Sequence, residues 1–284
     1  MSWIKKDRPK IKTSSTEIKD VPENLWISCP KCGEMVHHKD FKKFQNSCPK
    51  CGYHMMLTPV ERFDILFDDS KYKALPHPEV KEDPLKFTDL KKYSDRLAQQ
   101  RAKTGEKDVI KSAIGKLNGQ EAVISVFDFR FMAGSMGVAT GEALVQAMKL
   151  AVSKKVPFVV LTASGGARMQ ESVLSLMQMV RTTVGVNMLD EAKLPYIVVF
   201  TDPTYGGVPA SFAMVGDIHI AEKGARIGFA GRRVIEETNR EKLPKEFQTA
   251  EFLKEKGMVD IVIDRQDMKS TLSNVMSLLL KAKK

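Results

Sequence analysis

Two pairs of glycines are the residues best suited to chemistry in this sequence. Gly165 and Gly166 follow one short apolar run, and Gly206 and Gly207 follow a second. Each pair precedes a stretch of helix-forming residues, which indicates a turn between a buried strand and a helix. Such a turn presents backbone N–H groups at the positive end of the helix dipole. Two such turns side by side would surround one reacting oxygen with N–H donors, which is the geometry of an oxyanion hole.

Few side chains near these turns are suited to acid–base or nucleophilic chemistry. Beyond residue 56 the chain has only two histidines, His77 and His219, and no cysteine. Ser164 precedes the first glycine pair, but no evident base accompanies it, so a turn residue is a better interpretation than a nucleophile. The pattern favours stabilisation of charge on an oxygen, such as that of a thioester enolate, with the proton chemistry supplied by the substrate or a cofactor.

The cysteines form two C-x-x-C pairs near the N-terminus. A glycine follows each pair (Gly33 and Gly52), which lets the chain turn so that backbone N–H groups approach the sulfur atoms. Fifteen residues separate the pairs, a spacing typical of a zinc ribbon. The predicted zinc ligands are Cys29, Cys32, Cys48 and Cys51. Because four thiolates complete a tetrahedral site, the zinc is expected to be structural, with His54 as an alternative ligand.

The composition indicates a soluble chain with one large domain and one small module. The chain has 284 residues, of which 43% are hydrophobic, and a net charge of +10, which favours acidic partners. No signal peptide or run of eighteen apolar residues is present, so we expect a cytoplasmic protein with no membrane-spanning helix. The expected parts are a flexible basic tail at 1–24, the zinc ribbon at 25–56 and the main domain at 57–284.

The main domain is expected to be an α/β fold with parallel strands, because apolar runs alternate with helical patterns. The Asn118-Gly119 pair predicts a hairpin turn before the first of these runs. Buried strands are predicted at 122–131, 156–162, 196–201, 225–229 and 259–263.

Helices are predicted between these strands and in the region before them. One covers 59–67, with Val60 among its inward residues, and a charged one covers 87–104. Thr140 is expected to cap the helix that follows Gly137. The long helix that ends near Asp190 is expected to turn its apolar residues inward, namely Val173, Leu176, Met177, Val180 and Val184.

Three stretches carry a resemblance to a known family. They read SGGARMQE, LPYIVVFTDPTYGGVPASFAM and GFAGRRVIEET followed closely by REKLP. Together with the cysteine ribbon, they resemble the β subunits of the bacterial acetyl-CoA carboxylase carboxyltransferase over residues 25–270. The resemblance implies a crotonase-like fold of ββα superhelical turns, with an N-terminal four-cysteine zinc ribbon. It also implies transfer of a carboxyl group from carboxybiotin to acetyl-CoA, which gives malonyl-CoA for fatty acid synthesis.

The resemblance implies roles for individual residues. Gly165 and Gly166 would supply one side of the oxyanion hole, and Gly206 and Gly207 the other. In the family the biotin ureido group takes the α-proton of acetyl-CoA, which agrees with the lack of a side-chain base. The loop at 131–141 would lie near the CoA moiety. The substrate-binding candidates are Gly134, Ser135, Gly137, Arg168 and Arg233.

Alternatives stay open for the two arginines, since Arg168 also suits a structural ion pair and Arg233 a solvated surface charge. The sequence departs from the family pattern at Ala133, where glycine is common, and at Arg232, where proline is common.

The number of glycine turns implies a partner. A carboxyltransferase must hold both a CoA thioester and a biotin ureido group, and one pair of turns accounts for one of these oxygens. The family supplies the other half as an α subunit in an α2β2 assembly. Biotin carboxyl carrier protein and biotin carboxylase are the further partners that the resemblance implies.

Two other functions remain open from the sequence. A cysteine ribbon with a basic arm is typical of nucleic-acid-binding proteins, and the ribbon could bind RNA or DNA or else cap the active site. A crotonase-type hydratase or isomerase would need a carboxylate opposite the thioester, for which Glu171 is the best-placed candidate.

Overall fold

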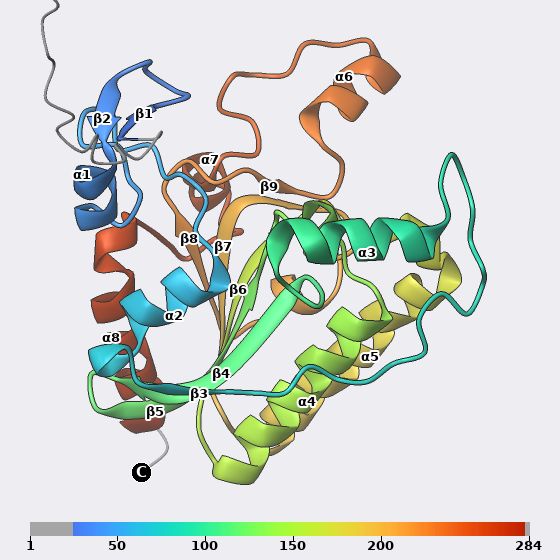
Figure 1. The fold of residues 1–284 in the computed structure, drawn as a ribbon. Helices are drawn as coiled ribbons and strands as arrows, with labels where there is room; N and C mark the ends of the chain where they lie inside the picture. The colour runs from blue at the N-terminus through green and yellow to red at the C-terminus, as the bar shows by residue number, and fades with distance from the viewer. Residues whose placement is uncertain (1–24, 282–284) are drawn as a thin grey trace, which may run out of the picture.

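The structure is a computed structural model that describes residues 25–281 (Figure 1). The tail expected at 1–24 lies outside the described residues. None of the described helices is both long enough and apolar enough to cross a membrane.

One mixed sheet forms the centre of the main domain. Its strand order is β10-β8-β7-β6-β5-β4-β3, and β9 pairs with β7. The strands from β5 to β10 along this order pair in parallel, whereas β3 and β4 are antiparallel to their neighbours. The bounds are β3 Tyr72–Ala74, β4 Ile110–Leu117, β5 Gln120–Phe127, β6 Phe158–Ser164, β7 Tyr196–Tyr205, β8 Ile218–Glu222, β9 Ile227–Gly228 and β10 Ile261–Ile263. The predicted α/β fold with parallel strands is confirmed; β8 was not predicted.

The hairpin between β4 and β5 confirms the turn predicted at Asn118-Gly119. Leu117 pairs with Gln120, so the loop has two residues, and both have positive φ, at 47° and 80°. Positive φ at both positions is the requirement of a type I′ turn.

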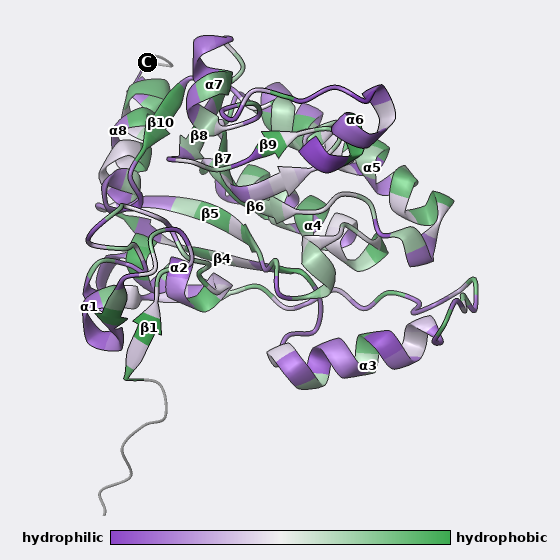
Figure 2. Ribbon diagram, turned by 90° about the horizontal axis from the view of Figure 1, so that it is seen from above, coloured by the Kyte–Doolittle hydropathy of each residue, from purple (hydrophilic) through white to green (hydrophobic). Residues whose placement is uncertain are grey.

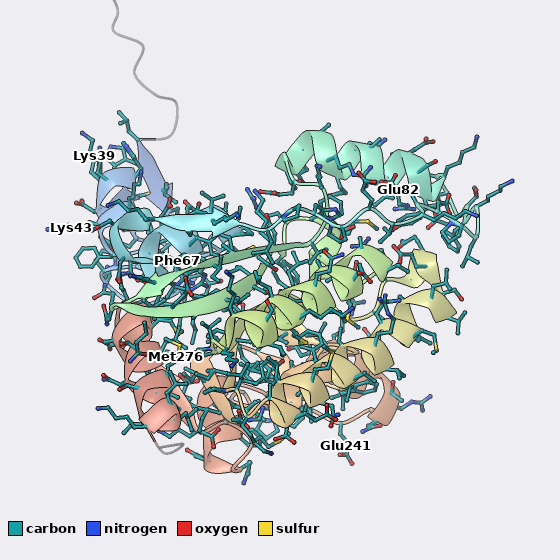
Figure 3. The ribbon with its side chains drawn as sticks, turned by 90° about the horizontal axis from the view of Figure 1, so that it is seen from below. Lys39, Lys43, Phe67, Glu82, Glu241 and Met276 are labelled. Atoms are coloured by element: carbon teal, nitrogen blue, oxygen red, sulfur yellow. The ribbon has the colours of Figure 1, made fainter. Side chains whose placement is uncertain are left out.

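Helices cover both faces of the sheet. Their bounds are α2 Pro59–Leu66, α3 Tyr93–Thr104, α4 Val138–Lys154, α5 Val173–Glu191, α6 Arg232–Asn239, α7 Ala250–Glu255 and α8 Met268–Lys281. Short 3₁₀ turns are η1 Asp68–Ser70, η2 Met132–Gly134, η3 Met169–Glu171, η4 Phe212–Met214 and η5 Arg265–Asp267. One core layer lies between the sheet and α4, and a second lies on the other face against α2 and α8. Phe67 and Met276, labelled in Figure 3, belong to the second layer.

Sequence expectations about α2, α3 and α4 are wrong at three points. Residues 87–92 are not helical, and α3, which is largely hydrophilic, begins only at Tyr93 (Figure 2). Val60 is exposed rather than inward, although Phe63 in the same helix is buried. Thr140 does not cap α4. Gly137 is the N-cap, and the buried Thr140 hydroxyl instead donates to Asp108 Oδ1 at 3.0 Å.

The apolar face of α5 points outward, contrary to the prediction. The helix packs on α4 through Ser175, Gln178, Thr182 and Gly185, which are buried. Gly185 is needed there, because an added Cβ would lie 2.6 Å from Met148 Sδ. The residues predicted to be inward are each 49–58% exposed, namely Val173, Leu176, Met177, Val180 and Val184. Small and polar residues therefore make the helix contact, and a stripe of apolar side chains faces solvent.

The N-terminal module contains β1 Trp26–Ser28, β2 Met35–His37 and α1 His38–Lys43. Its two strands pair antiparallel and do not join the main sheet. A small apolar cluster that includes Phe41 and two of the cysteines forms its core.

A buried charge cluster centred on Glu222, at the end of β8, lies where the ribbon meets the main domain. Arg62 and Arg265 each place two guanidinium nitrogens on the Glu222 carboxylate. All three side chains are at most 7% exposed. Burial alone would raise the pKa of Glu222, but the two arginine charges outweigh it and lower that pKa.

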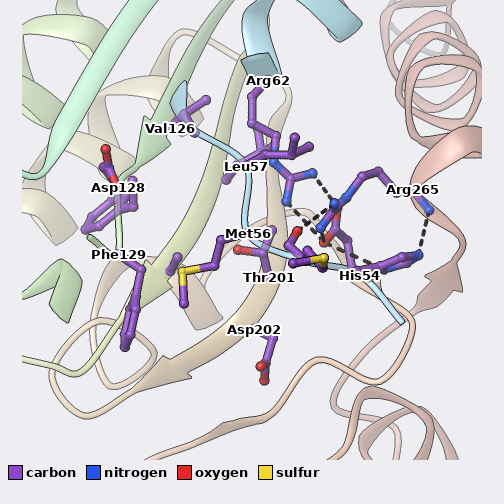
Figure 4. Close-up of a pocket in the computed structure, with 15 residues that line it drawn as sticks. His54, Met56, Leu57, Arg62, Val126, Asp128, Phe129, Thr201, Asp202 and Arg265 are labelled. Carbon is purple, nitrogen blue, oxygen red and sulfur yellow. Dashed lines mark hydrogen bonds and ion pairs between the residues drawn. The ribbon is translucent and has the colours of Figure 1, made fainter. Parts of the chain in front are cut away.

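Arg265 extends this cluster to the ribbon. Its Nη1 donates to the carbonyl oxygens of Gln45 at 2.9 Å and Met55 at 2.7 Å. Figure 4 shows Arg265 and Arg62 converging beside the segment that carries His54. One side chain thus binds both a domain carboxylate and the ribbon backbone, and it holds the ribbon against the carboxyl ends of the strands.

We expect Arg265→Met to lower the free energy of unfolding by about 3–5 kcal/mol, because it removes one partner of a buried charge cluster. Urea unfolding would measure the change. Because the folded-state pKa of Glu222 is lowered, its contribution is present above about pH 4 and is lost as the pH falls below that value. Lys193→Met, which removes an exposed ion pair with Asp190, is the control and should leave stability almost unchanged. Equal losses in both variants would contradict this account of the cluster.

Candidate functional site

The two glycine turns are in direct contact at the carboxyl ends of β6 and β7. Ser164 pairs with Thr204 at the end of these neighbouring strands, so the residues that follow lie side by side. A Cβ on Gly206 would lie only 2.8 Å from the Gly166 Cα. Both residues also have positive φ, 120° at Gly166 and 67° at Gly206. Glycine is therefore required both by the close approach and by the backbone conformation. The turns lie together as expected, but neither pair begins a helix: α5 starts only at Val173, and turns and η4 follow Gly207.

Three of the four predicted N–H donors already have acceptors within the chain. Gly165 N–H donates to the Ala133 carbonyl at 2.8 Å, and Gly206 N–H donates to the Phe229 carbonyl at 2.9 Å. Gly166 N–H donates to Ser164 Oγ at 3.0 Å. These glycines therefore shape the turns, and their N–H groups are not open to a ligand.

Two other N–H groups remain open at the contact between the turns. Among the described residues, neither Gly207 N–H nor Ala167 N–H donates a hydrogen bond; Gly207 is buried and Ala167 is half-buried. The groups are neighbours, because a Cβ on Gly207 would lie 3.6 Å from Ala167 N. Sequence reasoning found Gly207 but missed Ala167. Its position directly after Gly166 was the only signal.

Ser164 is the last residue of β6 rather than a turn residue, and its hydroxyl is engaged within the chain. Its buried hydroxyl donates to the Gly134 carbonyl at 2.7 Å and accepts from Gly166 N–H. Gly134 packs directly on the strand end, since a Cβ there would lie 2.0 Å from the Ala163 carbonyl oxygen. The loop that contains Gly134, Ser135 and Gly137 therefore backs the first turn.

Arg168 is buried, and its guanidinium is held by groups of the chain itself. Its side chain is 1% exposed and pairs with Asp108 and Glu171, which is the ion-pair alternative left open by the sequence. All three guanidinium nitrogens have acceptors, which include the Tyr93 hydroxyl and both oxygens of Ser135. Asp108 and Tyr93 could not be predicted as its partners, because both come from distant segments.

Glu171 is not placed as a free base. Its Oε1 accepts from the Tyr93 hydroxyl at 2.5 Å, and its Oε2 accepts from Val138 N–H at 2.6 Å. A carboxylate with both oxygens engaged in a buried ion pair is poorly suited to take a substrate proton. The hydratase alternative therefore loses its candidate residue.

Arg233 lies on α6 with an exposed side chain that pairs with Glu237 at 2.7 Å. Neighbouring Arg232 instead holds the following loop, because its Nη1 donates to the Pro244 carbonyl at 2.6 Å. The two arginines thus differ, and Arg233 has the exposure that a contact with a phosphate would need.

The four cysteines have the geometry of a zinc site. Their Sγ atoms all lie within 4.8 Å of one another, with 3.7 Å between Cys29 and Cys51 and 3.8 Å between Cys32 and Cys48. A tetrahedron with zinc–sulfur bonds of about 2.3 Å has edges of about 3.8 Å. The residues therefore fit zinc, which would hold the ribbon together through four thiolates and leave no open position.

The turns of this site also match the prediction. The glycine after each C-x-x-C pair has positive φ, 72° at Gly33 and 68° at Gly52. Cys29 receives backbone hydrogen bonds that lower its pKa to about 7, although burial acts in the opposite direction.

His54 is engaged elsewhere. Its Nε2 accepts from Arg265 N–H at 3.4 Å, and its Nδ1 lies 3.8 Å from Glu222. Burial lowers the pKa of His54, so the neutral ring is favoured. This geometry makes His54 part of the contact between ribbon and domain rather than a zinc ligand.

Two family models match the chain. The model described as a carboxyl transferase domain matches residues 83–284, and the one described as an acetyl-CoA carboxylase zinc finger domain matches residues 26–52. Neither description concerns nucleic-acid binding.

Curated relatives match over nearly the whole chain. The acetyl-coenzyme A carboxylase carboxyl transferase subunit beta of Agrobacterium fabrum is 55% identical and covers 99% of this chain and 95% of its own length. The protein of the same name from Methylocella silvestris is 54% identical, over 98% of this chain and 96% of its own.

Solved structures share the fold at low identity. Transcarboxylase 12S superposes with a TM-score of 0.63 at 22% identity, over 85% of this chain and 43% of that one. A chain of the Pseudomonas malonate decarboxylase hetero-dimer superposes with a TM-score of 0.59 at 21% identity, over 79% and 86%. The predicted crotonase-like α/β fold with its zinc ribbon is confirmed.

We expect one zinc ion per chain, and none in Cys48→Ser, because structural zinc needs all four ligands. His54→Ala is the matched variant and should keep its zinc, since its ring contacts Arg265 and Glu222 instead. Metal analysis of purified protein would measure both. Zinc loss in His54→Ala with the four cysteines intact would make His54 a ligand and contradict this assignment.

Proposed function

This chain belongs to the family of acetyl-coenzyme A carboxylase carboxyl transferase β subunits, and from that premise we propose how its backbone takes part in the transfer. The proposed reaction moves a carboxyl group from carboxybiotin on the biotin carboxyl carrier protein to acetyl-CoA, giving malonyl-CoA. The observation that supports it is the pair of open N–H groups, on Ala167 and Gly207, where the two turns meet.

These N–H groups would hold the thioester oxygen of acetyl-CoA as negative charge develops on it. Fixed backbone donors are suited to this task because they need no reorganisation during the reaction. Gly165, Gly166 and Gly206 act indirectly in this proposal, since their N–H groups are bonded and the small size of Gly166 and Gly206 allows the turns to touch.

Carboxybiotin, when bound, would supply the carboxyl group and a base for the α-proton. The nearby acidic side chains of this chain support that division of labour. Asp108 and Glu171 are both buried and paired with Arg168. The protein would therefore contribute orientation and electrostatics, which is the usual division in cofactor chemistry.

The loop that backs the first turn is the proposed neighbour of the CoA moiety. Gly134, Ser135 and Gly137 belong to it, and the first and last of these leave no room for a side chain. Arg233, exposed on α6, is the proposed contact for a CoA phosphate.

The apolar stripe on α5 is the proposed contact surface for the α subunit. It begins at Val173, close to the first turn, and runs along the helix through Val180 to Val184. An exposed row of apolar side chains marks a surface that another protein covers. A matched fold in malonate decarboxylase occurs within a hetero-dimer, and an α2β2 assembly would bring a second pair of turns beside this one.

The nucleic-acid alternative has no comparable observation in its favour. The ribbon of this chain is docked through Arg265, and its family model describes an acetyl-CoA carboxylase zinc finger. We therefore propose the ribbon as the part that covers the carboxyl ends of the strands.

Malonyl-CoA should form from acetyl-CoA and a carboxybiotin donor only when this chain is mixed with its α subunit. Gly207→Val should lower kcat by at least about 100-fold, because the added side chain enters the space beside Ala167 N–H. A Cβ at this position is tolerated, since Gly207 has no positive φ and the nearest atom to the Cβ would belong to the flexible Met179 side chain, so Gly207→Ala is the milder variant. Product formation measured by chromatography, with zinc content and Tm as folding checks, would test this.

Ala210→Val adds bulk to the same segment at an exposed position and should keep wild-type activity. Full activity of Gly207→Val would show that the open N–H groups take no part in the mechanism. An inactive wild-type mixture, folded and loaded with zinc, would refute the proposed reaction itself.

Val180→Asp should weaken binding of the α subunit at least about tenfold, because it places a charge in the centre of an apolar contact. Leu278→Asp is the matched control, since Leu278 is 68% exposed on α8, across the sheet from α5. Analytical ultracentrifugation of each variant with the α subunit would measure the affinities. Equal affinities for the two variants would place the α subunit on another surface.

A further inference from the structure

The turn that carries Ala167 depends on the loop behind it. Met136 N–H donates to the Gly166 carbonyl at 2.8 Å, and Arg168 N–H donates to the Met136 carbonyl at 2.9 Å. These bonds form a short parallel bridge between Met136 and Ala167. Met136 makes both bonds of this bridge, so the N–H of Ala167 points away from the loop, and the loop determines which N–H group of the turn stays open.

The Arg168 side chain fixes the same loop. Its Nη2 donates to the Ser135 carbonyl at 2.9 Å, and its Nε lies 3.3 Å from Ser135 Oγ. The guanidinium is itself held by Asp108 through two hydrogen bonds, at 2.7 and 2.9 Å. Arg168 therefore binds the loop through both its backbone N–H and its side chain.

Glu171 holds the other end of the loop. It accepts from Arg168 Nη1 at 3.2 Å and from Val138 N–H, the first residue of α4, at 2.6 Å. The positive end of a seventeen-residue helix stabilises a carboxylate at this place. Gly137 permits the approach, because a Cβ there would lie 2.5 Å from Glu171 Oε1.

The charges of this cluster are fixed by its geometry. Burial alone would raise the pKa of Asp108, but Arg168 and the donors Val109 N–H and Thr140 Oγ1 lower it. Burial would likewise lower the pKa of Arg168, and Asp108 raises it instead. Neither group is suited to exchange protons during a reaction, so the cluster serves to hold geometry.

We propose that Arg168 is a positioning residue for the transfer reaction, acting through the loop at 133–138 on the open N–H of Ala167. All of its guanidinium nitrogens are hydrogen-bonded within the chain, so its replacement should lower the rate constant and leave substrate binding almost unchanged. Only the kinetic part of this inference rests on the proposed carboxyl transfer.

The test is Arg168→Lys in the chain assembled with its α subunit. Lysine keeps the positive charge but has no planar fork, so it cannot bind Asp108 twice and reach Ser135 as well. We expect kcat to fall about 10- to 100-fold, since misplacement of a reacting group by about 1 Å has effects of this size. KM for acetyl-CoA should stay within about twofold.

Arg62→Lys is the matched control. Arg62 is also a buried arginine with two nitrogens on one carboxylate, but it lies at the contact with the ribbon, away from the turns. Both variants should lower Tm, and only Arg168→Lys should lower kcat. Amide hydrogen exchange gives a second readout, and it should increase in peptides covering 133–138 and 165–168 in Arg168→Lys and not in Arg62→Lys.

Three kinetic results would overturn the proposal: an unchanged kcat in Arg168→Lys, an equal loss of kcat in Arg62→Lys, or a rise in KM with kcat intact. The last would mean direct contact with substrate. If the wild-type assembly formed no malonyl-CoA, the proposed reaction would fail, and hydrogen exchange would still decide the positioning role. Unchanged exchange at both segments in Arg168→Lys would overturn it on that readout.

Discussion

The site depends on one contact, the approach of two backbone turns with no side chain between them. Gly166 and Gly206 lie so close that a Cβ on either would meet the other backbone at 2.8–3.2 Å. Both also need positive φ, which other residues adopt only with strain. Neighbouring parallel strands bring two strand ends to one edge of a sheet, but only glycine allows the turns beyond them to touch. The open N–H groups at this edge are a consequence of that contact.

Buried arginines hold the surroundings of this contact in place. Arg168 fixes the loop behind the first turn, and Arg265 fixes the ribbon over the strand ends. In each case the guanidinium binds a carboxylate on one side and backbone carbonyls on the other. A planar group with five donors can join two segments in this way, whereas a lysine cannot. The desolvation of such clusters is costly, so they are better explained by the geometry they impose than by a gain in stability.

The sequence predicted those features that depend on short-range rules. Backbone geometry accounts for the turn residues Gly33, Gly52, Asn118 and Gly119. The spacing of the cysteines was enough to predict all four zinc ligands. The apolar runs predicted the central strands, because parallel strands are buried on both faces and therefore consist mostly of apolar residues. The Asp108–Arg168–Glu171 cluster was not predictable, since Asp108 lies sixty residues from Arg168 and only the fold brings them together. The same holds for Glu222 and Arg265. Which N–H groups remain open was also beyond the sequence, because it depends on where Ala133 and Phe229 place their carbonyls.

The error at α5 has a different cause and says more about the assembly. Apolar periodicity identifies the face of a helix that avoids water, but it does not say whether the covering surface belongs to the same chain. Within the chain, α5 approaches α4 closely through Gly185 and polar residues. The apolar stripe that begins at Val173 and ends at Val184 therefore faces solvent. In a subunit, this arrangement places an apolar surface directly after the first glycine turn, so that a second chain seated on α5 would also lie beside the open N–H groups. The orientation of one helix thus links the half-site inferred from the glycine turns to the surface that would complete it.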